Sequence, residues 1–115
     1  MLVTDPHVDF QYTVRADKDC NNYLCCRPDS GFPTEWERQA SEWGEYKCDT
    51  APKTLRAMFI YIRDVIKPDV IFWTGDNSPH SIWENDEAEV IEATLNMTLM
   101  IKEVLGNSTI TIIPI

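Results

Sequence analysis

The sequence predicts an α/β fold in which short parallel strands alternate with helices. Two observations support this class. Short apolar runs that fit strands alternate along the chain with segments whose apolar residues recur at helical spacing. A long cysteine-rich segment without such a period separates the first strand from the first helix. With 115 residues, the chain has the size of one domain or of a part of one.

The first strand is expected at residues 2–4, which lead into "DPH" at residues 5–7. The residue before a proline favours an extended backbone, so Pro6 fits a strand that ends in a turn. Residues 8–51 then show no sustained period, and they contain all four cysteines. An irregular segment of this length is uncommon in a compact domain unless it is functional or cross-linked. We therefore expect residues 8–51 to form a cross-linked, cysteine-rich loop.

The first helix is expected after this loop, because five apolar residues fall on one stripe at helical spacing. They are Leu55, Met58, Phe59, Ile62 and Ile66. Pro52 suits the first turn of this helix, and Pro68 marks its end. The apolar run at residues 70–73 follows. A short unbroken run of this kind fits a central parallel strand that is buried on both faces.

The second helix is expected to open at Ser81, whose hydroxyl can form a capping box with Glu84. Acidic residues in the next turn suit the positive end of the helix dipole: Asp86, Glu87 and Glu89. The helix should continue to Leu105 and stop at Gly106, before a third strand within residues 109–115. Right-handed crossovers would make the three strands parallel, with the loops at their carboxyl ends on one rim.

Charge and cysteine usage restrict the partners and the compartment. A net charge of -9 repels nucleic acid and anionic lipid, but not cations or neutral headgroups. The cysteines fit disulfides better than the alternative zinc site, because no two of them form a C-x-x-C pair: Cys20, Cys25, Cys26 and Cys48. Glycosylation sequons at Asn96, on the exposed face expected for the second helix, and at Asn107 also point to the secretory pathway.

Polar side chains collect at the predicted rim. Asp5 and His7 are two residues apart, so in an extended segment both would point to the same side, as two ligands of one metal would. Asp76 follows Gly75 at the end of the strand at residues 70–73, where its carboxylate would be partly desolvated. Carboxylate and imidazole ligands suit zinc, manganese or iron, and a carboxylate can bridge two ions that bind a phosphate. The pattern therefore predicts a metal site for phosphoester hydrolysis.

Each of these residues also has a simpler interpretation. Asp76 alone would fit an Asx turn or a helix cap, and His7 alone would fit an ordinary loop histidine. His80, four residues beyond Asp76, would contact the phosphate or protonate the leaving oxygen, or else cap or pack against the second helix. The combination of Asp-x-His at one strand end with Gly-Asp at a later one favours the metal site.

Four stretches carry a resemblance that covers nearly the whole chain: "TDPHVDFQY", "LCCRPDSG", "WGEYKCDTAPKTL" and "WTGDNSPHSIWE". They resemble the acid sphingomyelinase family within the calcineurin-like metallophosphoesterases. The cysteine-rich stretch followed by "WGEY" is the most specific feature, and it is more similar to the sphingomyelinase branch than to the related nucleotide-cleaving phosphodiesterases. The resemblance implies a layered α/β sandwich that uses two zinc ions to hydrolyse sphingomyelin to ceramide and phosphocholine.

By this resemblance, Asp5 and His7 would bind the first zinc, and Asp76 would bridge both ions. His80 would lie beside the substrate phosphate. The substrate would be sphingomyelin or another choline phosphodiester, and a membrane would serve only as the surface that carries it. The same resemblance implies two disulfides: Cys20–Cys25 and Cys26–Cys48.

Other parts of the family pattern have no match up to Ile115: the Gly-Asn-His that follows the third strand, three later histidine ligands, and the preceding saposin-like domain. Pro6 and Phe10 also differ from the residues expected in this branch. The resemblance implies that residues 1–115 are the amino-terminal part of the catalytic domain of a secreted or lysosomal glycoprotein, with an incomplete second zinc site and little activity alone. A non-catalytic secreted binding module and a nucleotide phosphodiesterase on the same scaffold are the alternatives.

Overall fold

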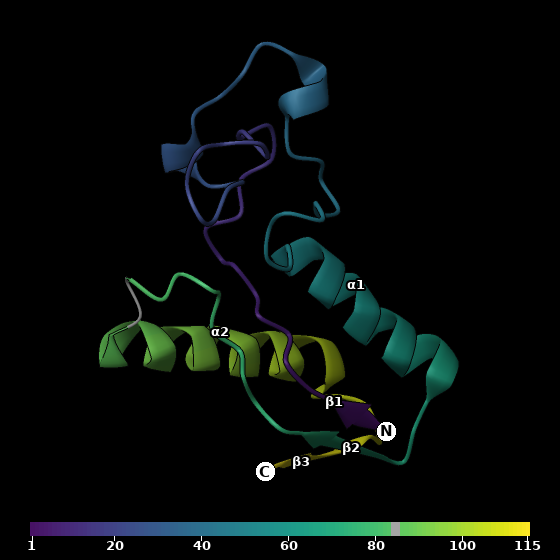
Figure 1. Ribbon diagram of the computed structural model, residues 1–115. Coiled ribbons are helices and arrows are strands. Elements are labelled where there is room, and N and C mark those ends of the chain that lie inside the picture. The colour runs from purple at the N-terminus through teal and green to yellow at the C-terminus, as the bar shows by residue number, and fades with distance from the viewer. Residues whose placement is uncertain (84–85) are drawn as a thin grey trace.

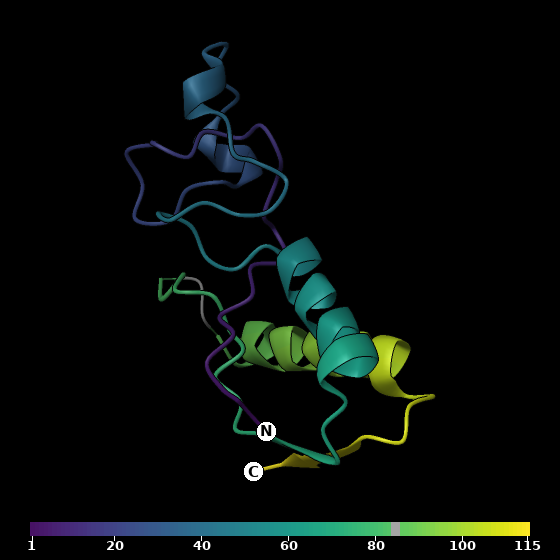
Figure 2. The same ribbon diagram turned by 90° about the vertical axis from the view of Figure 1, so that its right-hand side faces the viewer.

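A computed structural model describes residues 1–83 and 86–115, and it confirms the α/β class. The strands are β1 (Leu2–Val3), β2 (Val70–Trp73) and β3 (Thr111–Pro114), and they form one parallel sheet in the order β1-β2-β3. The crossovers carry α1 (Pro52–Tyr61) and α2 (Glu87–Leu105). Both helices lie on the same side of the sheet, and the cysteine-rich loop extends beyond them, away from the strands (Figures 1 and 2).

The predicted stripe of the first helix is only partly buried. Leu55, Phe59 and Ile62 are buried, whereas Met58 is 37% exposed and Ile66 is 48% exposed. Ile66 is exposed because α1 ends at Tyr61 and the chain continues as a π-helical turn over Ile62–Ile66. The wider turn changes the direction of the later side chains. This turn ends at Lys67 in the left-handed conformation, one residue before Pro68.

The prediction that β2 is buried on both faces was wrong. Ile71 is 1% exposed, but its neighbour Phe72 is 42% exposed. Successive strand residues point to opposite faces, and α1 and α2 cover only one of them. On the other face, Phe72 lies in register with Leu2 of β1 and Ile113 of β3, and all three side chains are exposed. The sheet therefore has one packed face and one open apolar row.

The second helix begins later than the sequence suggested. Ser81 is buried in the segment before it, Glu84 lies outside the described residues, and α2 begins at Glu87. Asp86 is the N-cap, because its carboxylate accepts a hydrogen bond of 2.9 Å from the backbone N–H of Glu89. A carboxylate in this position also suits the helix dipole. The expected end at Leu105 is correct.

The hydrophobic core lies between the covered face of the sheet and the two helices. The sheet contributes Val3 and Ile71, and the rest of the core comes from Val8, from the α1 segment with Leu55, Phe59 and Ile62, and from α2 with Met97, Ile101, Val104 and Leu105. Burial of these side chains removes apolar area from water, which is the main favourable contribution to folding. No helix in the described residues is both long and apolar enough to cross a membrane.

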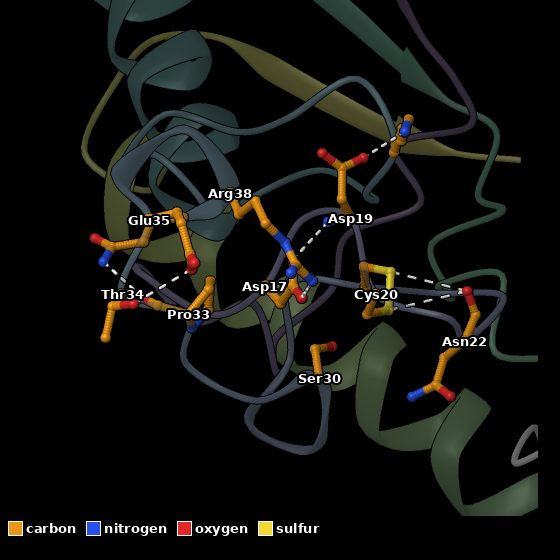
Figure 3. Close-up of polar contacts among 12 residues, drawn as sticks. Asp17, Asp19, Cys20, Asn22, Ser30, Pro33, Thr34, Glu35 and Arg38 are labelled. Atoms are coloured by element: carbon orange, nitrogen blue, oxygen red, sulfur yellow. Dashed lines mark hydrogen bonds and ion pairs between the residues drawn. A yellow bond between two sulfur atoms is a disulfide. The ribbon is translucent and has the colours of Figure 1, made fainter.

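The cysteine-rich loop is held by two disulfides, Cys20–Cys25 and Cys26–Cys48. All four thiols are used, so a zinc site made of these cysteines is excluded. The loop has its own polar core, in which the guanidinium of Arg27 donates to the buried carboxylate of Asp9 at 2.8 Å. Nearer its surface, Arg38 donates to Asp17 (Figure 3). The buried pair of Arg27 and Asp9 stabilises the loop only while both charges are present, because either charge alone would be buried without a partner of opposite charge.

Replacing Ile71 by Ala should lower the free energy of unfolding by about 2 to 5 kcal/mol, because it opens a cavity under both helices. Phe72→Ala is the matched control on the open face, and it should cost less than about 2 kcal/mol. Urea denaturation of both variants measures the difference. Equal losses would show that the open face is packed in solution.

Removing the Cys26–Cys48 disulfide by a double substitution to serine should destabilise the chain more than removing Cys20–Cys25. The sequence separations are 22 and 5 residues, which correspond to about 3 and about 2 kcal/mol of chain entropy in the unfolded state. Guanidinium denaturation of the two double variants makes the comparison. The reverse order of stability would contradict the entropic argument.

Candidate metal centre

The site residues are brought together because β1 and β2 keep pairing after their strands end. The backbone N–H of Asp5 donates to the carbonyl oxygen of Gly75 at 3.2 Å, and that of His7 donates to the carbonyl oxygen of Asp76 at 3.3 Å. These bonds extend the contact between the two chain segments beyond the pair of Val3 and Trp73. The rim that the parallel topology predicts is therefore a pair of chain segments bonded to each other.

Asp5, His7 and Asp76 form the group that can hold a metal ion in the described part of the chain. One ligand atom from each of the three lies within 4.8 Å of the others. The Nε2 of His7 is 3.5 Å from a carboxylate oxygen of Asp76. Both carboxylates are exposed and the imidazole is half-buried, so an ion from solvent can reach the group.

All three residues have a backbone conformation that residues other than glycine rarely adopt. Their φ angles are 48° for Asp5, 37° for His7 and 54° for Asp76, and Gly75 beside them is at 84°. The extended Asp-x-His segment expected from the sequence is therefore wrong. The two side chains converge from residues with positive φ on either side of Pro6, and not through the alternation of a strand. Left-handed residues of this kind cost of order 1 to 3 kcal/mol each, so the surrounding hydrogen bonds must hold them.

His7 is oriented as a metal ligand would be. Its Nδ1 lies 2.8 Å from the carbonyl oxygen of Ser78. A carbonyl only accepts hydrogen bonds, so Nδ1 is the donor, and Nε2, on the side of Asp76, is the nitrogen left to bind an ion. Histidines that bind metals commonly donate their other ring N–H to a carbonyl in this way. The Thr4 hydroxyl donates in turn to the carboxylate of Asp5.

The donor set fits a divalent transition metal. Two carboxylates and one neutral imidazole suit zinc, manganese or iron, and a group of this kind leaves coordination positions for water or substrate. Without a cation, the negative charges of Asp5 and Asp76 repel each other at short range. An ion between them would remove this repulsion.

His80 lies beside this group without belonging to it. Its ring stacks on the ring of His7, with centroids 4.1 Å apart and planes at 31°. The interpretation of His80 as a cap of the second helix is wrong, because α2 begins only at Glu87. The ring is exposed, and its Nδ1 is bound by Asp49.

Asp49 was not predicted from the sequence. Both of its carboxylate oxygens bind His80: Oδ1 lies 2.7 Å from the ring Nδ1, and Oδ2 accepts from the backbone N–H at 2.6 Å. The available signal was its place directly after Cys48, in the most specific stretch of the sequence. Asn77, at the same rim, has a structural partner, because its side-chain oxygen accepts from the indole N–H of Trp73 at 3.0 Å.

The two sequons differ in exposure. Asn107 is exposed in the turn after α2, whereas Asn96 is half-buried. The expectation that Asn96 lies on an open face is therefore wrong. The start of the cysteine-rich loop and residues 79–81 lie over this part of α2, where they line a shared hollow with Asn96.

Comparison with known proteins identifies the relatives of this chain. It is 40% identical over 108 residues to sphingomyelin phosphodiesterase B of Dictyostelium discoideum. It is 36% identical to the sphingomyelin phosphodiesterase of Bos taurus and 34% identical to that of Homo sapiens, over 107 residues each. Each alignment covers 92% of this chain and 17% of the relative, so the chain spans about a sixth of the length of these proteins. No protein-family model matches the chain.

These matches run over nearly the whole of this chain, at 34 to 40% identity. The chain belongs to the acid sphingomyelinase family of phosphodiesterases.

Proposed function

We propose that this chain contributes to the metal centre of a zinc-dependent phosphodiesterase that hydrolyses sphingomyelin to ceramide and phosphocholine. The observation that carries the proposal is the convergence of Asp5, His7 and Asp76, with the Nε2 of His7 turned towards Asp76. The substrate is supported by the names of the relatives, which are sphingomyelin phosphodiesterases. Since the chain spans 17% of their length, the activity is proposed for a protein of which these residues form part.

In this proposal, Asp5 and His7 hold the first zinc ion. Asp76 offers two carboxylate oxygens, so we assign it to both ions of a two-metal centre. When bound, zinc would lower the pKa of a coordinated water and polarise a phosphoryl oxygen. Hydrogen bonds from Thr4 to Asp5 and from His7 to Ser78 orient two of the three side chains before an ion arrives, which reduces the entropy lost on binding.

His80 is assigned to the substrate side of the centre. Its ring lies against that of His7, and it is exposed to solvent. From this position the imidazole would contact a phosphate oxygen or pass a proton to the leaving oxygen. We therefore assign His80 as a catalytic residue and not as a metal ligand.

The architecture and compartment follow the same proposal. The sheet, its two helices and the cysteine-rich loop at 8–51 would be part of a layered metallophosphoesterase sandwich, in a catalytic domain of which residues 1–115 are one portion. The disulfides and the sequons at Asn96 and Asn107 favour a secreted or lysosomal glycoprotein. A membrane would act only as the surface that presents the lipid.

Two alternatives predict different measurements. A secreted binding module that uses the disulfide loop and the acidic surface would be indifferent to zinc. A nucleotide phosphodiesterase on the same scaffold would bind zinc, but it would prefer a nucleotide to a choline phosphodiester.

The metal-free chain should bind zinc, and Asp76→Ala should weaken that binding at least about tenfold, because a ligand of the ion is lost. Isothermal titration calorimetry measures both affinities. Asp64→Ala is the matched control: Asp64 is exposed, pairs with Arg63 and lies in the π-helical turn. Equal zinc affinity in the wild type and in Asp76→Ala would exclude the proposed site.

With zinc bound, the 115-residue chain should hydrolyse sphingomyelin far more slowly than a full-length relative. We assign only Asp76 to the second ion, so this ion would be weakly held and the attacking and leaving oxygens would not be held together. Release of phosphocholine from sphingomyelin measures the rate, and a nucleotide phosphodiester serves as the competing substrate. A rate comparable to that of the full-length relative would refute the incomplete centre, and a preference for the nucleotide would support the alternative enzyme.

A further inference from the structure

The contact between Asp49 and His80 joins the cysteine-rich loop to the metal centre. One carboxylate binds the same residue twice, at 2.7 Å to the ring Nδ1 and at 2.6 Å to the backbone N–H. The two bonds together fix the position of His80 along the chain and the rotation of its ring. A single bond would leave the ring free to turn about the side-chain torsions.

Asp49 is itself held from both sides. Cys48 before it is bonded to the buried Cys26. Thr50 after it donates its backbone N–H to the carbonyl oxygen of His7 at 3.1 Å, and its own carbonyl accepts from Asp9 at 3.0 Å. The loop therefore closes onto the segment that carries two of the candidate ligands. Asp49 is fixed relative to His7, and His80 is fixed relative to Asp49.

The exposure of the two side chains shows which of them orients the other. The Asp49 side chain is 11% exposed, whereas the His80 side chain is 62% exposed. A carboxylate that is largely removed from water needs hydrogen-bond donors, and His80 supplies two of them. The buried carboxylate is the fixed partner, and the imidazole is the group that a ligand can reach.

We propose that Asp49 is a positioning residue for His80, and that the Cys26–Cys48 disulfide keeps Asp49 in place. The carboxylate of Asp49 accepts a hydrogen bond from Nδ1–H, which leaves Nε2, on the opposite edge of the ring, to meet the substrate. The identity of that substrate rests on the proposed function, but the orientation of the ring does not. The cysteine-rich loop thus sets which nitrogen of His80 stays available to a ligand.

Nitrogen NMR on the metal-free chain tests this proposal, because the two ring nitrogens of a histidine give different signals with and without a proton. The spectra are recorded at a pH above which the ring signals no longer change. In the wild type, the ring of His80 should carry its proton on Nδ1. Asp49→Ala should shift both ring nitrogens towards the values of exchanging tautomers, and it should weaken the proton contacts between the rings of His80 and His7. His7, the other histidine of the chain, is held by Ser78 and should keep its proton on Nδ1.

Asp19→Ala is the matched control, since Asp19 lies in the same loop and pairs with Lys47 instead. It should leave the spectrum of His80 unchanged. If Asp49→Ala does not fold, Asp49→Asn replaces it: one acceptor oxygen cannot make both contacts, so the His80 signals should still shift. Unchanged His80 resonances in a folded Asp49 variant, or an equal change in Asp19→Ala, would overturn the proposal. The spectra contain no zinc, so a failure of zinc binding would not affect this result.

Discussion

The structure depends on one constraint, which is that the parallel pairing of β1 with β2 continues beyond both strands. The backbone bonds from Asp5 and His7 to residues 75 and 76 join two segments that are distant in sequence. They also force left-handed conformations on non-glycine residues at the rim. Together, the hydrogen bonds and the positive φ angles place two carboxylates and one imidazole around a common space. The hydrophobic core against the sheet stabilises the fold and offsets the cost of these left-handed residues.

The cysteine-rich loop is a structural part of this arrangement and not an appendage. Its base is joined to the metal-centre segment by the bridge between Val8 and Thr50, and its interior is fixed by two disulfides and by the buried pair of Asp9 and Arg27. Because the disulfides restrict the unfolded chain, a loop with few apolar contacts can still hold Asp49 in one place. Asp49 in turn holds the ring and the backbone of His80 through two hydrogen bonds.

Much of the fold could be predicted from local patterns. The apolar stripe of Leu55, Phe59 and Ile62, the short run at residues 70–73 and the proline and glycine boundaries gave the correct elements and the parallel sheet. The errors concern properties that depend on the rest of the molecule. The open face at Phe72 depends on where the helices pack, and the start of α2 depends on the competition between Ser81 and Asp86 as caps.

The candidate site shows the same division between local and non-local information. Asp5, His7 and Asp76 stand out by residue type and by their place at strand ends, but their backbone conformations come from hydrogen bonds across the rim.

Zinc-edge anomalous diffraction from crystals of the zinc-loaded chain tests the account most directly. We expect one anomalous peak within bonding distance of Asp5, His7 and Asp76. A peak bound only by other residues, or crystals in which these three side chains point apart, would contradict it.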